Sequence, residues 1–411
     1  MLEEKSVFIA SYCYLLSEKT EGDSYLSGPS EDLFAYLIPR CKEAAFLRQP
    51  LSDSIVSNVY LKRVHKGVLK DERVMSFFNA LHRYIAQKAS FTGLGLIVSI
   101  LYKFRDIFSI CWAFFILKNK YDIFIGVESV NALTGCIMRL IGLVNIVVYD
   151  VIDYAPERFT GKLANKIFHK LDRCALRFCN VAVSQTSLIV EHRIRLYNNI
   201  RAKQVVKPSG IAHDRLEKIS LSRINRHEVI YAGLVHEMDG VELIVGSAIE
   251  LLKTFPDLKV RIIGDGDQLD KIKKLSRDSN LVNHIQFMGF IYEKNLLEDY
   301  LKHAAVAVAP YKEYKNRNIV KYFNDVNKPR LYLACGLPVV ITKVPSVHRE
   351  IHDRKAGIAI DYSQSQMVEA ITKILKEDAV LEQYRENAYQ MAKEYTWESI
   401  FDRMFNEIMA D

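Results

Sequence analysis

Short apolar runs alternate with longer amphipathic segments along the second half of this chain. The runs are VIYAG (229–233), VRIIGDG (260–266), IQFMGF (285–290), AVAVAP (305–310), LPVVIT (337–342) and AGIAID (356–361). They are apolar at successive positions, which is typical of strands buried on both faces of a parallel sheet. The helical segments between them predict a doubly wound α/β domain.

The first half repeats this pattern less regularly. Its runs are VFIASY (7–12), YDIFIGVES (121–129), NIVVYDVID (145–153), VAVSQTS (181–187) and KQVVKPSG (203–210), and the stretch 50–120 gives no clear prediction. Because 411 residues exceed what one core usually holds, we expect two domains. We place them at 1–210 and 229–394, with a polar linker at 211–228.

The tail 395–411 has apolar residues on one helical face, with Thr396 as the expected N-cap. This C-terminal helix must bury its apolar face. It packs either within the second domain or, by crossing back, on the first domain.

The most apolar stretch, 91–122, is interrupted by Lys103, Arg105 and Asp106. A transmembrane helix needs about 20 uninterrupted apolar residues. We therefore expect a buried core helix, or alternatively a helix that lies on a membrane surface, where Lys103 and Arg105 would meet the lipid.

Charge and cysteine usage narrow the class of protein. The net charge is +7 from 56 basic and 49 acidic residues, which is too balanced for a nucleic-acid-binding protein and favours anionic small molecules or an anionic membrane. Seven cysteines without a CxxC pair, and an acidic N-terminus where a signal peptide is basic, predict a reduced cytoplasmic protein without a zinc site.

Candidate ligand-binding turns follow the predicted strands of the second domain. Ligands of open α/β sheets bind beyond the carboxyl ends of the strands, where helix N-termini present backbone N–H groups. After VIYAG, Gly233 permits close backbone approach and Asp239 is placed to cap the next helix. After VRIIG, Gly264 and Gly266 shape a turn that suits a base or ribose. Such turns are common, so neither is specific by itself, and an ordinary connection is the alternative for each.

Tyr311 follows AVAVAP, where its ring is placed to lie against a flat ligand ring, and the basic insertion KEYKNRNIVKYFND comes next. A loop of this length in a compact domain is usually a lid or a binding loop. The alternative is an ordinary solvated loop.

The stretch DVNKPRLYLACGLPVVIT (325–342) places Lys328 and Arg330 on either side of Pro329 at the start of an apolar helix. Proline suits the first helical turn. Two cations there oppose the positive end of the helix dipole unless an anion joins them. A phosphate or diphosphate would remove this conflict, and two solvent-facing cations are the alternative.

Five segments together resemble the nucleotide-binding half of a GT-B glycosyltransferase: YAG…G (231–240), IIGDGD (262–267), VAPY (308–311), NKPRLYLACGLPVVIT (327–342) and YTW (395–397). The resemblance is closest to family 4-like enzymes and to the xanthan-type glucuronosyltransferase. It covers 229–405 well and 121–200 moderately. It implies an α/β fold with two Rossmann-like doubly wound domains facing each other across a cleft.

The resemblance also implies a donor site. Lys328 would bind the donor diphosphate at the helix start that also contains Pro329, Arg330 and Leu331. The turn 264–267, with Asp267, and Tyr311 would lie near the base or ribose. Gly233, next to Leu234, would let the diphosphate approach the backbone.

Three departures from the family pattern alter this site. Leu331 stands where relatives have a ribose-binding glutamate, Asp239 stands where they have a lysine, and no arginine lies near Leu234. We expect the missing cation to come from the loop that contains Lys312, Lys315, Arg317 and Lys321, or else the diphosphate to bind weakly.

In the first domain, VVYDVIDYAPERF (147–159) is similar to the segment that supplies an aspartate base in the glucuronosyltransferase. Asp153 matches that position, Asp150 is its neighbour, and Glu128 stands near the place of a histidine in many relatives. An N-cap or salt bridge explains Asp153 equally well.

These observations predict a hexosyltransferase of cell-surface polysaccharide assembly. It would move a sugar, with inversion, from a nucleotide sugar (UDP favoured) to a hydroxyl of a glycan or lipid-linked acceptor, with Asp153 taking the proton. The resemblance implies no bound cofactor or metal. We expect a cytoplasmic enzyme, with peripheral contact at the inner membrane face and no nucleic-acid partner. A nucleotide-sugar epimerase and a degenerate nucleotide-binding or scaffold protein are the alternatives.

Overall fold

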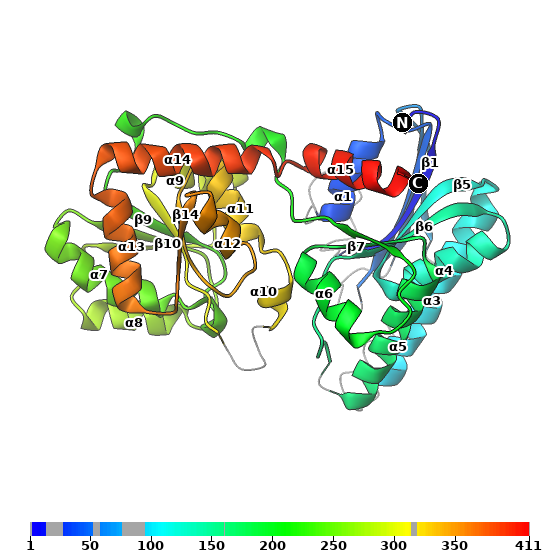
Figure 1. Ribbon diagram of the computed structural model, residues 1–411, viewed down its shortest axis with the longest axis horizontal. Coiled ribbons are helices and arrows are strands. Elements are labelled where there is room, and N and C mark those ends of the chain that lie inside the picture. Colours follow the sequence, from blue (N-terminus) through cyan, green and yellow to red (C-terminus); the bar gives the residue numbers. More distant parts are fainter. Residues whose placement is uncertain are drawn as a thin grey trace. The chain divides into compact units, whose positions relative to one another are not determined.

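The computed structural model describes residues 2–13, 28–51, 58–75, 95–159, 161–313 and 319–410. The chain divides into two compact units, Met1–Lys207 with Phe401–Asp411, and Pro208–Ile400. Each unit contains one sheet and its covering helices (Figure 1). The domain boundaries expected from the sequence stay predictions.

The sheet of the first unit has the order β4-β3-β2-β1-β5-β6-β7-β8. Its strands are β1 (Ser6–Cys13), β2 (Glu43–Pro50), β3 (Val59–His65), β4 (Val68–Met75), β5 (Tyr121–Val127), β6 (Val144–Val151), β7 (Val181–Ser184) and β8 (Lys203–Val206). β3 pairs antiparallel with β2 and β4, and the other pairs are parallel. The strand order reverses between β1 and β5, so their carboxyl ends form the switch point at which open α/β sheets bind ligands.

The helices of the first unit are α1 (Pro29–Leu37), α3 (Gly95–Leu117), α4 (Glu128–Leu140), α5 (Lys162–Phe178) and α6 (Ser187–Leu196). α4 contacts both α3 and α5. The C-terminal helix α15 (Trp397–Met409) joins this unit from Phe401 onward, where the rings of Phe401 and Phe405 lie 5.3 and 6.0 Å from that of Tyr36. The backbone N–H of Ser399 donates to Thr396 Oγ1 at 3.2 Å, so the predicted N-cap is confirmed.

The sheet of the second unit is entirely parallel, in the order β11-β10-β9-β12-β13-β14. Its strands are β9 (Glu228–Ala232), β10 (Lys259–Ile263), β11 (Ile285–Gly289), β12 (Val306–Ala309), β13 (Val339–Thr342) and β14 (Gly357–Ile360). All six strands predicted from apolar runs are confirmed. The order is that of a Rossmann domain, with its switch point between β9 and β12.

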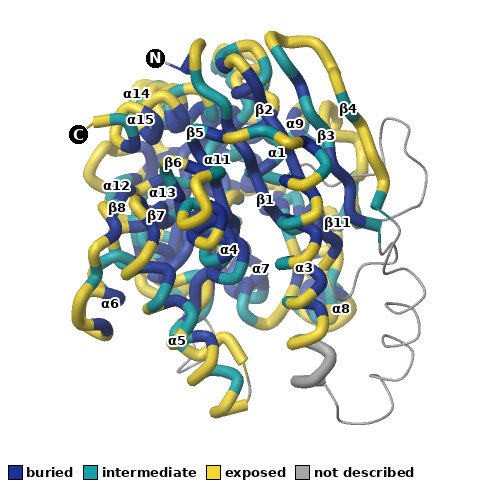
Figure 2. Tube along the Cα trace, turned by 90° about the vertical axis from the view of Figure 1, so that its right-hand side faces the viewer, coloured by how far each residue is buried: buried dark blue, intermediate teal, exposed yellow. Residues whose placement is uncertain are grey.

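Helices cover both faces of the second sheet (Figure 1). They are α7 (Glu242–Thr254), α8 (Leu269–Asp278), α9 (Lys294–His303), α10 (Ile319–Phe323), α11 (Asn327–Ala334), α12 (His348–Asp353), α13 (Gln364–Leu375) and α14 (Asp378–Lys393), with short 3-10 helices η1 (His213–Arg215), η2 (Leu221–Arg223) and η3 (Glu237–Asp239). Alternate residues of β9 enter different cores, Val229 and Tyr231 on one face, Ile230 and Ala232 on the other. β9, β12 and β13 are accordingly buried along their length, whereas the edge strand β11 is mostly half-buried (Figure 2).

The stretch 50–120, which has no clear pattern in the sequence, contains β3, β4 and α3. β4 lies at the sheet edge and is mostly exposed, so it lacks the continuous apolar run of a buried strand. Among the described residues, no helix has both the length and the hydropathy that crossing a membrane requires.

Candidate active site

Two glycine turns meet at the switch point of the second unit. Gly233 follows β9 with φ +155°, and a Cβ at this position would collide with the side chain of Lys328. Gly264 follows β10 with φ +134°, and a Cβ there would collide with the carbonyl oxygen of Gly233. A Cβ on Gly266 would similarly meet the backbone of Val235. The glycines thus let the two turns and Lys328 pack closely.

Lys328 lies in the first turn of α11 and points to the end of β9. Its Nζ donates to the hydroxyl of Tyr231 at 2.6 Å and to Oδ1 of Asp239 at 2.8 Å. The expectation that Asp239 caps the next helix is wrong, because α7 begins after Val241 with no side-chain cap. Asp239 is instead a buried counter-ion.

A second lysine shares this carboxylate. Lys321 Nζ, from α10, donates to Asp239 Oδ1 at 2.6 Å. Both ammonium groups lie over the ring of Tyr311, 4.7 Å from its centroid for Lys321 and 5.3 Å for Lys328. Two cations therefore share one anion, and the cluster keeps a net positive charge.

The loop after β12 was expected to supply a missing cation. The structure brings Lys321 to Lys328, whereas Lys312 forms an ion pair with Glu242. Lys315 and Arg317 lie outside the described residues.

The protonation of this cluster depends on burial and mutual charge. Burial lowers the pKa of Lys328 to about 8; Lys321 adds to the shift, and the Asp239 carboxylate opposes it. Burial alone would raise the pKa of Asp239, but the two lysines outweigh it and the pKa lies below its ordinary value. Asp239 is therefore charged at neutral pH, whereas Lys328 loses its proton at a pH of about 8, close to neutrality.

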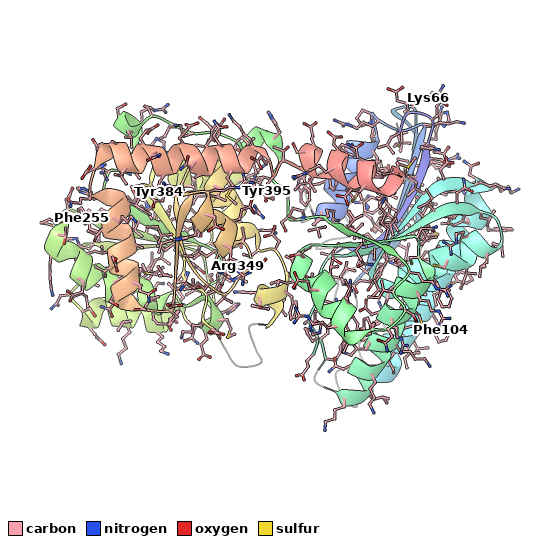
Figure 3. The ribbon with its side chains drawn as sticks, viewed as in Figure 1. Lys66, Phe104, Phe255, Arg349, Tyr384 and Tyr395 are labelled. Carbon is pink, nitrogen blue, oxygen red and sulfur yellow. The ribbon has the colours of Figure 1, made fainter. Side chains whose placement is uncertain are left out.

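Two predicted ligand contacts need correction. Tyr311 is buried beneath the lysines, so its ring is not available to a ligand ring. Arg330 is also buried; its Nε donates to Asp325 Oδ2 at 3.1 Å, and its guanidinium lies 3.6 Å from the ring centroid of Tyr395, which Figure 3 labels. Arg330 is a structural residue here, not a phosphate ligand.

The other predicted residues of this edge differ in accessibility. Pro329 is buried in the first turn of α11, and Leu331 is half-buried with no side-chain hydrogen-bonding group. Leu234 is exposed, and its carbonyl accepts a hydrogen bond from Tyr231. Asp267 is exposed and pairs with His236, whose Nδ1 lies 2.7 Å from its Oδ1.

Two exposed aromatic residues beyond β11 are not among the site residues predicted from the sequence. Phe290 and Tyr292 are 57% and 90% exposed, and their ring centroids lie 4.6 Å apart. The N–H of Gly264 donates to the carbonyl of Gly289 at 2.8 Å, which fixes this segment beside the β10 turn. The sequence GFIY, with two aromatic residues directly after a predicted strand, could have indicated them, because ligands bind at this edge of the sheet.

In the first unit, Glu128 begins α4 at the switch point, with φ +67°. A non-glycine residue in this region costs about 1–3 kcal/mol, and such strain clusters at functional sites. Arg158 Nη1 donates to Glu128 Oε1 and Oε2 at 3.0 and 2.9 Å and to the carbonyl of Asp153 at 3.2 Å. Arg158 thereby fixes the loop after β6 against the start of α4, and leaves Asp153 exposed.

Asp150 has a different environment from Asp153. It is buried near the end of β6, and Lys207 Nζ donates to its Oδ2 at 2.5 Å. This corrects its place among the candidate bases, because an acceptor hydroxyl cannot reach a carboxylate enclosed in a buried ion pair. Among the residues that the structure describes, no cluster of three or more His, Cys, Asp or Glu side chains is suited to hold a metal ion.

Two Rossmann-like units, each with polar side chains at the switch point of a mostly parallel sheet, define the GT-B fold of glycosyltransferases. Anabaena HepE in complex with UDP superimposes with a TM-score of 0.63 at 15% identity, over 98% of each chain. Sucrose-phosphate synthase of Thermosynechococcus elongatus gives 0.62 at 14% identity, also over 98% of each chain. The prediction of an α/β protein with two Rossmann-like domains is confirmed.

The sequence of the second unit adds a similarity to a known family. Residues 226–377 match the family model described as Glycosyl transferases group 1. An uncharacterized glycosyltransferase of Methanocaldococcus jannaschii is 26% identical over 223 residues, 50% of this chain and 52% of that protein. The phosphatidyl-myo-inositol mannosyltransferase of Mycolicibacterium smegmatis is 24% identical over 171 residues, 41% of each. The chain thus spans about half the length of these relatives or less.

Proposed function

We propose that this protein is a glycosyltransferase that moves a sugar from a nucleoside-diphosphate sugar to an acceptor hydroxyl. The observation that carries the proposal is the pairing of Lys328 and Lys321 with the single carboxylate of Asp239, in a unit with group 1 glycosyl transferase sequence. The remaining positive charge lies beside the first turn of α11. A helix N-terminus with an adjacent cation suits a diphosphate.

A UDP-sugar is the favoured donor. Structures of HepE and of the pneumococcal O-GlcNAc transferase GtfA contain UDP, which supports this choice by analogy of fold. The exposed rings of Phe290 and Tyr292 lie at the edge where a base would bind, and base–aromatic stacking contributes about 1–3 kcal/mol per base. Leu331 offers the ribose no hydrogen bond, so stacking and the diphosphate would provide most of the donor affinity.

Asp153 is the proposed general base. Its exposure and the Arg158 bridge that orders its loop support this role, in addition to the resemblance of its segment in the sequence to the xanthan-type glucuronosyltransferase. Asp153 would take the proton of the acceptor hydroxyl as that oxygen bonds to the anomeric carbon. The bond from the anomeric carbon to the diphosphate breaks on the opposite side, which inverts the configuration. The departing diphosphate gains negative charge, which Lys328 and Lys321 would stabilise.

The proposed acceptor is a glycan or a lipid-linked saccharide of cell-surface polysaccharide assembly. The mycobacterial relative is named as a phosphatidyl-myo-inositol mannosyltransferase, and a structure of TarM contains fondaparinux, α-GlcNAc-glycerol and UDP. Both support a saccharide or lipid-borne hydroxyl as acceptor. Metal independence also stays a prediction, and retained transfer in EDTA would support it.

One observation favours a second candidate, a nucleotide-binding scaffold without transferase activity. Asp239 places a carboxylate beside the proposed diphosphate ligands, where it partly neutralises them. A nucleotide-sugar epimerase has no comparable support, and it would convert the donor without any acceptor.

The deciding experiment is thermal stabilisation by a panel of nucleoside diphosphates and nucleotide sugars, followed by donor turnover. Wild type is compared with Lys328→Ala and with Lys373→Ala, an exposed lysine of α13. A shift by UDP or a UDP-sugar that Lys328→Ala loses and Lys373→Ala retains supports the donor site. Binding without hydrolysis or transfer favours the scaffold, and no shift with any nucleotide contradicts the donor site itself.

A further inference from the structure

We propose that the outer face of α3, α4 and α5 is a docking surface for an anionic lipid bilayer. The surface lies within the first unit, and its argument uses no residue of the donor site. The proposal therefore goes beyond glycosyl transfer and is tested independently of it.

The first observation is an aromatic stripe on α3. Ile110, Ala113 and Phe114 are buried, whereas the opposite side carries residues that are 41–66% exposed: Leu101, Phe104, Phe108, Trp112 and Phe115. The three- and four-residue spacing places them on one helical face, with the Trp112 ring centroid 6.0 Å from that of Phe108 and 5.3 Å from that of Phe115. Phe104 lies on the outer side of α3 in Figure 3. A surface helix normally presents polar residues there.

The charged residues of α3 do not belong to this stripe, which corrects the sequence-based expectation. Arg105 is buried, and its Nη2 lies 2.7 Å from Asp106 Oδ1. Lys103 Nζ donates to the hydroxyl of Tyr12 at 2.8 Å. Reversing the charge of Arg105 would therefore break a buried ion pair and would not test membrane contact.

The second observation is a row of cations on α5. Its exposed face carries five basic residues at a spacing of three or four: Lys162, Lys166, Lys170, Arg173 and Arg177. The only acid of α5, Asp172, is buried and pairs with Arg193 at 2.7 Å. Within the described part of the chain, none of the five basic residues forms an ion pair. Their charge is thus not compensated by neighbouring side chains.

Apolar residues accompany these cations. Leu163, Ile167 and Phe178 are exposed beside them on α5. This interleaving of basic and large apolar side chains is typical of helices that lie in a membrane interface, where cations meet headgroups and apolar groups enter the acyl boundary.

α4 connects the two helices into one surface. It contacts both α3 and α5, and its end exposes Ile137 and Leu140, the latter at 83%, while the half-buried Arg139 donates to the carbonyl of Phe178. The three helices directly precede the adjacent strands β5, β6 and β7. Their last turns, with Phe115, Leu140 and Phe178, therefore lie along the edge at which these strands begin.

The charge distribution selects a bilayer over a second copy of the chain. A symmetric dimer through this surface would place the same patch of both copies together, and the α5 cations would repel each other. A nucleic acid would match the cations and leave the aromatic stripe of α3 without a partner. An anionic bilayer accommodates both features.

The test is co-sedimentation of the full chain with vesicles of phosphatidylcholine alone or mixed with phosphatidylglycerol. One variant combines Lys166→Glu, Lys170→Glu and Arg173→Glu; a second combines Phe104→Ser and Phe115→Ser. The matched control combines Lys271→Glu, Lys274→Glu and Arg277→Glu on α8, which are equally exposed and change the charge by the same amount. Circular dichroism and the midpoint of thermal unfolding check the fold of each protein.

We expect wild type and the α8 control to bind the anionic vesicles, and to bind the neutral ones weakly. The α5 variant should lose binding by about a hundredfold, and the α3 variant should also bind less. If the α5 variant does not fold, the corresponding glutamine substitutions replace it. Equal losses in the α5 and α8 variants, or no preference for anionic vesicles, would overturn the proposal. The proposal would also be overturned if the wild-type protein did not bind vesicles and instead formed a dimer that the Phe104→Ser and Phe115→Ser variant no longer forms.

Discussion

The ammonium of Lys328 and the carboxylate of Asp239 lie 2.8 Å apart, at the start of α11. This ion pair explains how a cation is tolerated beside the positive end of a helix dipole, since the dipole alone would repel it. The same ion pair also determines how much positive charge the site offers to a ligand. An incoming diphosphate must share both lysines with Asp239, so its affinity depends on how these three charges are balanced.

The first prediction concerns pH. The pKa of Lys328 is lowered to about 8 by burial, so the free protein loses this charge as the pH rises through that value. UDP affinity should therefore be nearly constant just below pH 8 and should fall above it, by at most about tenfold per pH unit for one proton. Isothermal titration calorimetry across this range measures it.

Lys328→Arg is the matched control for this pH effect, because a guanidinium stays protonated throughout the range. The fall in affinity above pH 8 should disappear in that variant. A wild-type profile that stays flat through pH 8 would mean that Lys328 does not contact the diphosphate.

The second prediction concerns Asp239 itself. Asp239→Asn keeps the shape of the side chain and removes the negative charge that competes with the diphosphate. We expect UDP to bind about tenfold more tightly, which corresponds to about 1.4 kcal/mol. The carboxylate also raises the pKa of Lys328, so its removal lowers that pKa further, and the titration is repeated at several pH values below 8. Asp361→Asn, an exposed carboxylate that pairs with Lys343, is the control and should change nothing. Weaker binding by Asp239→Asn would show that the carboxylate mainly positions the lysines.

The third prediction separates the two aspartates of the first unit. Asp153→Asn should lower kcat by about 10²–10⁴ and leave the KM for the donor and the stability nearly unchanged, because it removes only a proton acceptor. Asp150→Asn should instead lower stability, since it leaves the buried Lys207 ammonium without its counter-ion. Steady-state kinetics and urea unfolding of both variants distinguish these roles. A large loss of kcat in a stable Asp150→Asn protein would reverse the assignment.

The sequence predicts the second unit well because buried parallel strands produce a local signal. Its six strands are short and mostly apolar, and the helix start with Lys328 is recognisable from the neighbouring proline and apolar residues. The antiparallel strands β3 and β4 lack such runs. β3 includes Lys62 and Arg63, and β4 is almost fully exposed, so neither has the pattern of a buried strand.

The contacts of the site that escaped prediction depend on distant parts of the chain. The sequence places Lys321 among four candidate cations, and only the fold reveals that it pairs with Asp239, 82 residues away. The burial of Tyr311 and Arg330 likewise cannot be read from their neighbours in sequence. Tyrosine and arginine occur both at ligand sites and in buried structural networks. Their neighbours in sequence do not distinguish these two roles.

The last prediction tests the structural role of Arg330. Its guanidinium pairs with the buried carboxylate of Asp325, which also accepts a hydrogen bond from the backbone N–H of Ser209 at 2.9 Å. Arg330→Met leaves that carboxylate without its cation and should destabilise the second unit by about 3–5 kcal/mol. Urea unfolding measures it, with the transition of each unit fitted separately. Lys328→Ala, two residues earlier, should lose UDP binding and cost far less stability.

The double variant Arg330→Met with Asp325→Asn sharpens this test. Asparagine retains an oxygen for the Ser209 bond and removes the uncompensated charge, so most of the lost stability should return. Such a recovery is the mark of a buried pair that acts as one unit. UDP affinity should then match that of wild type, because neither residue contacts the diphosphate. A double variant that is stable and still fails to bind UDP would return Arg330 to the donor site.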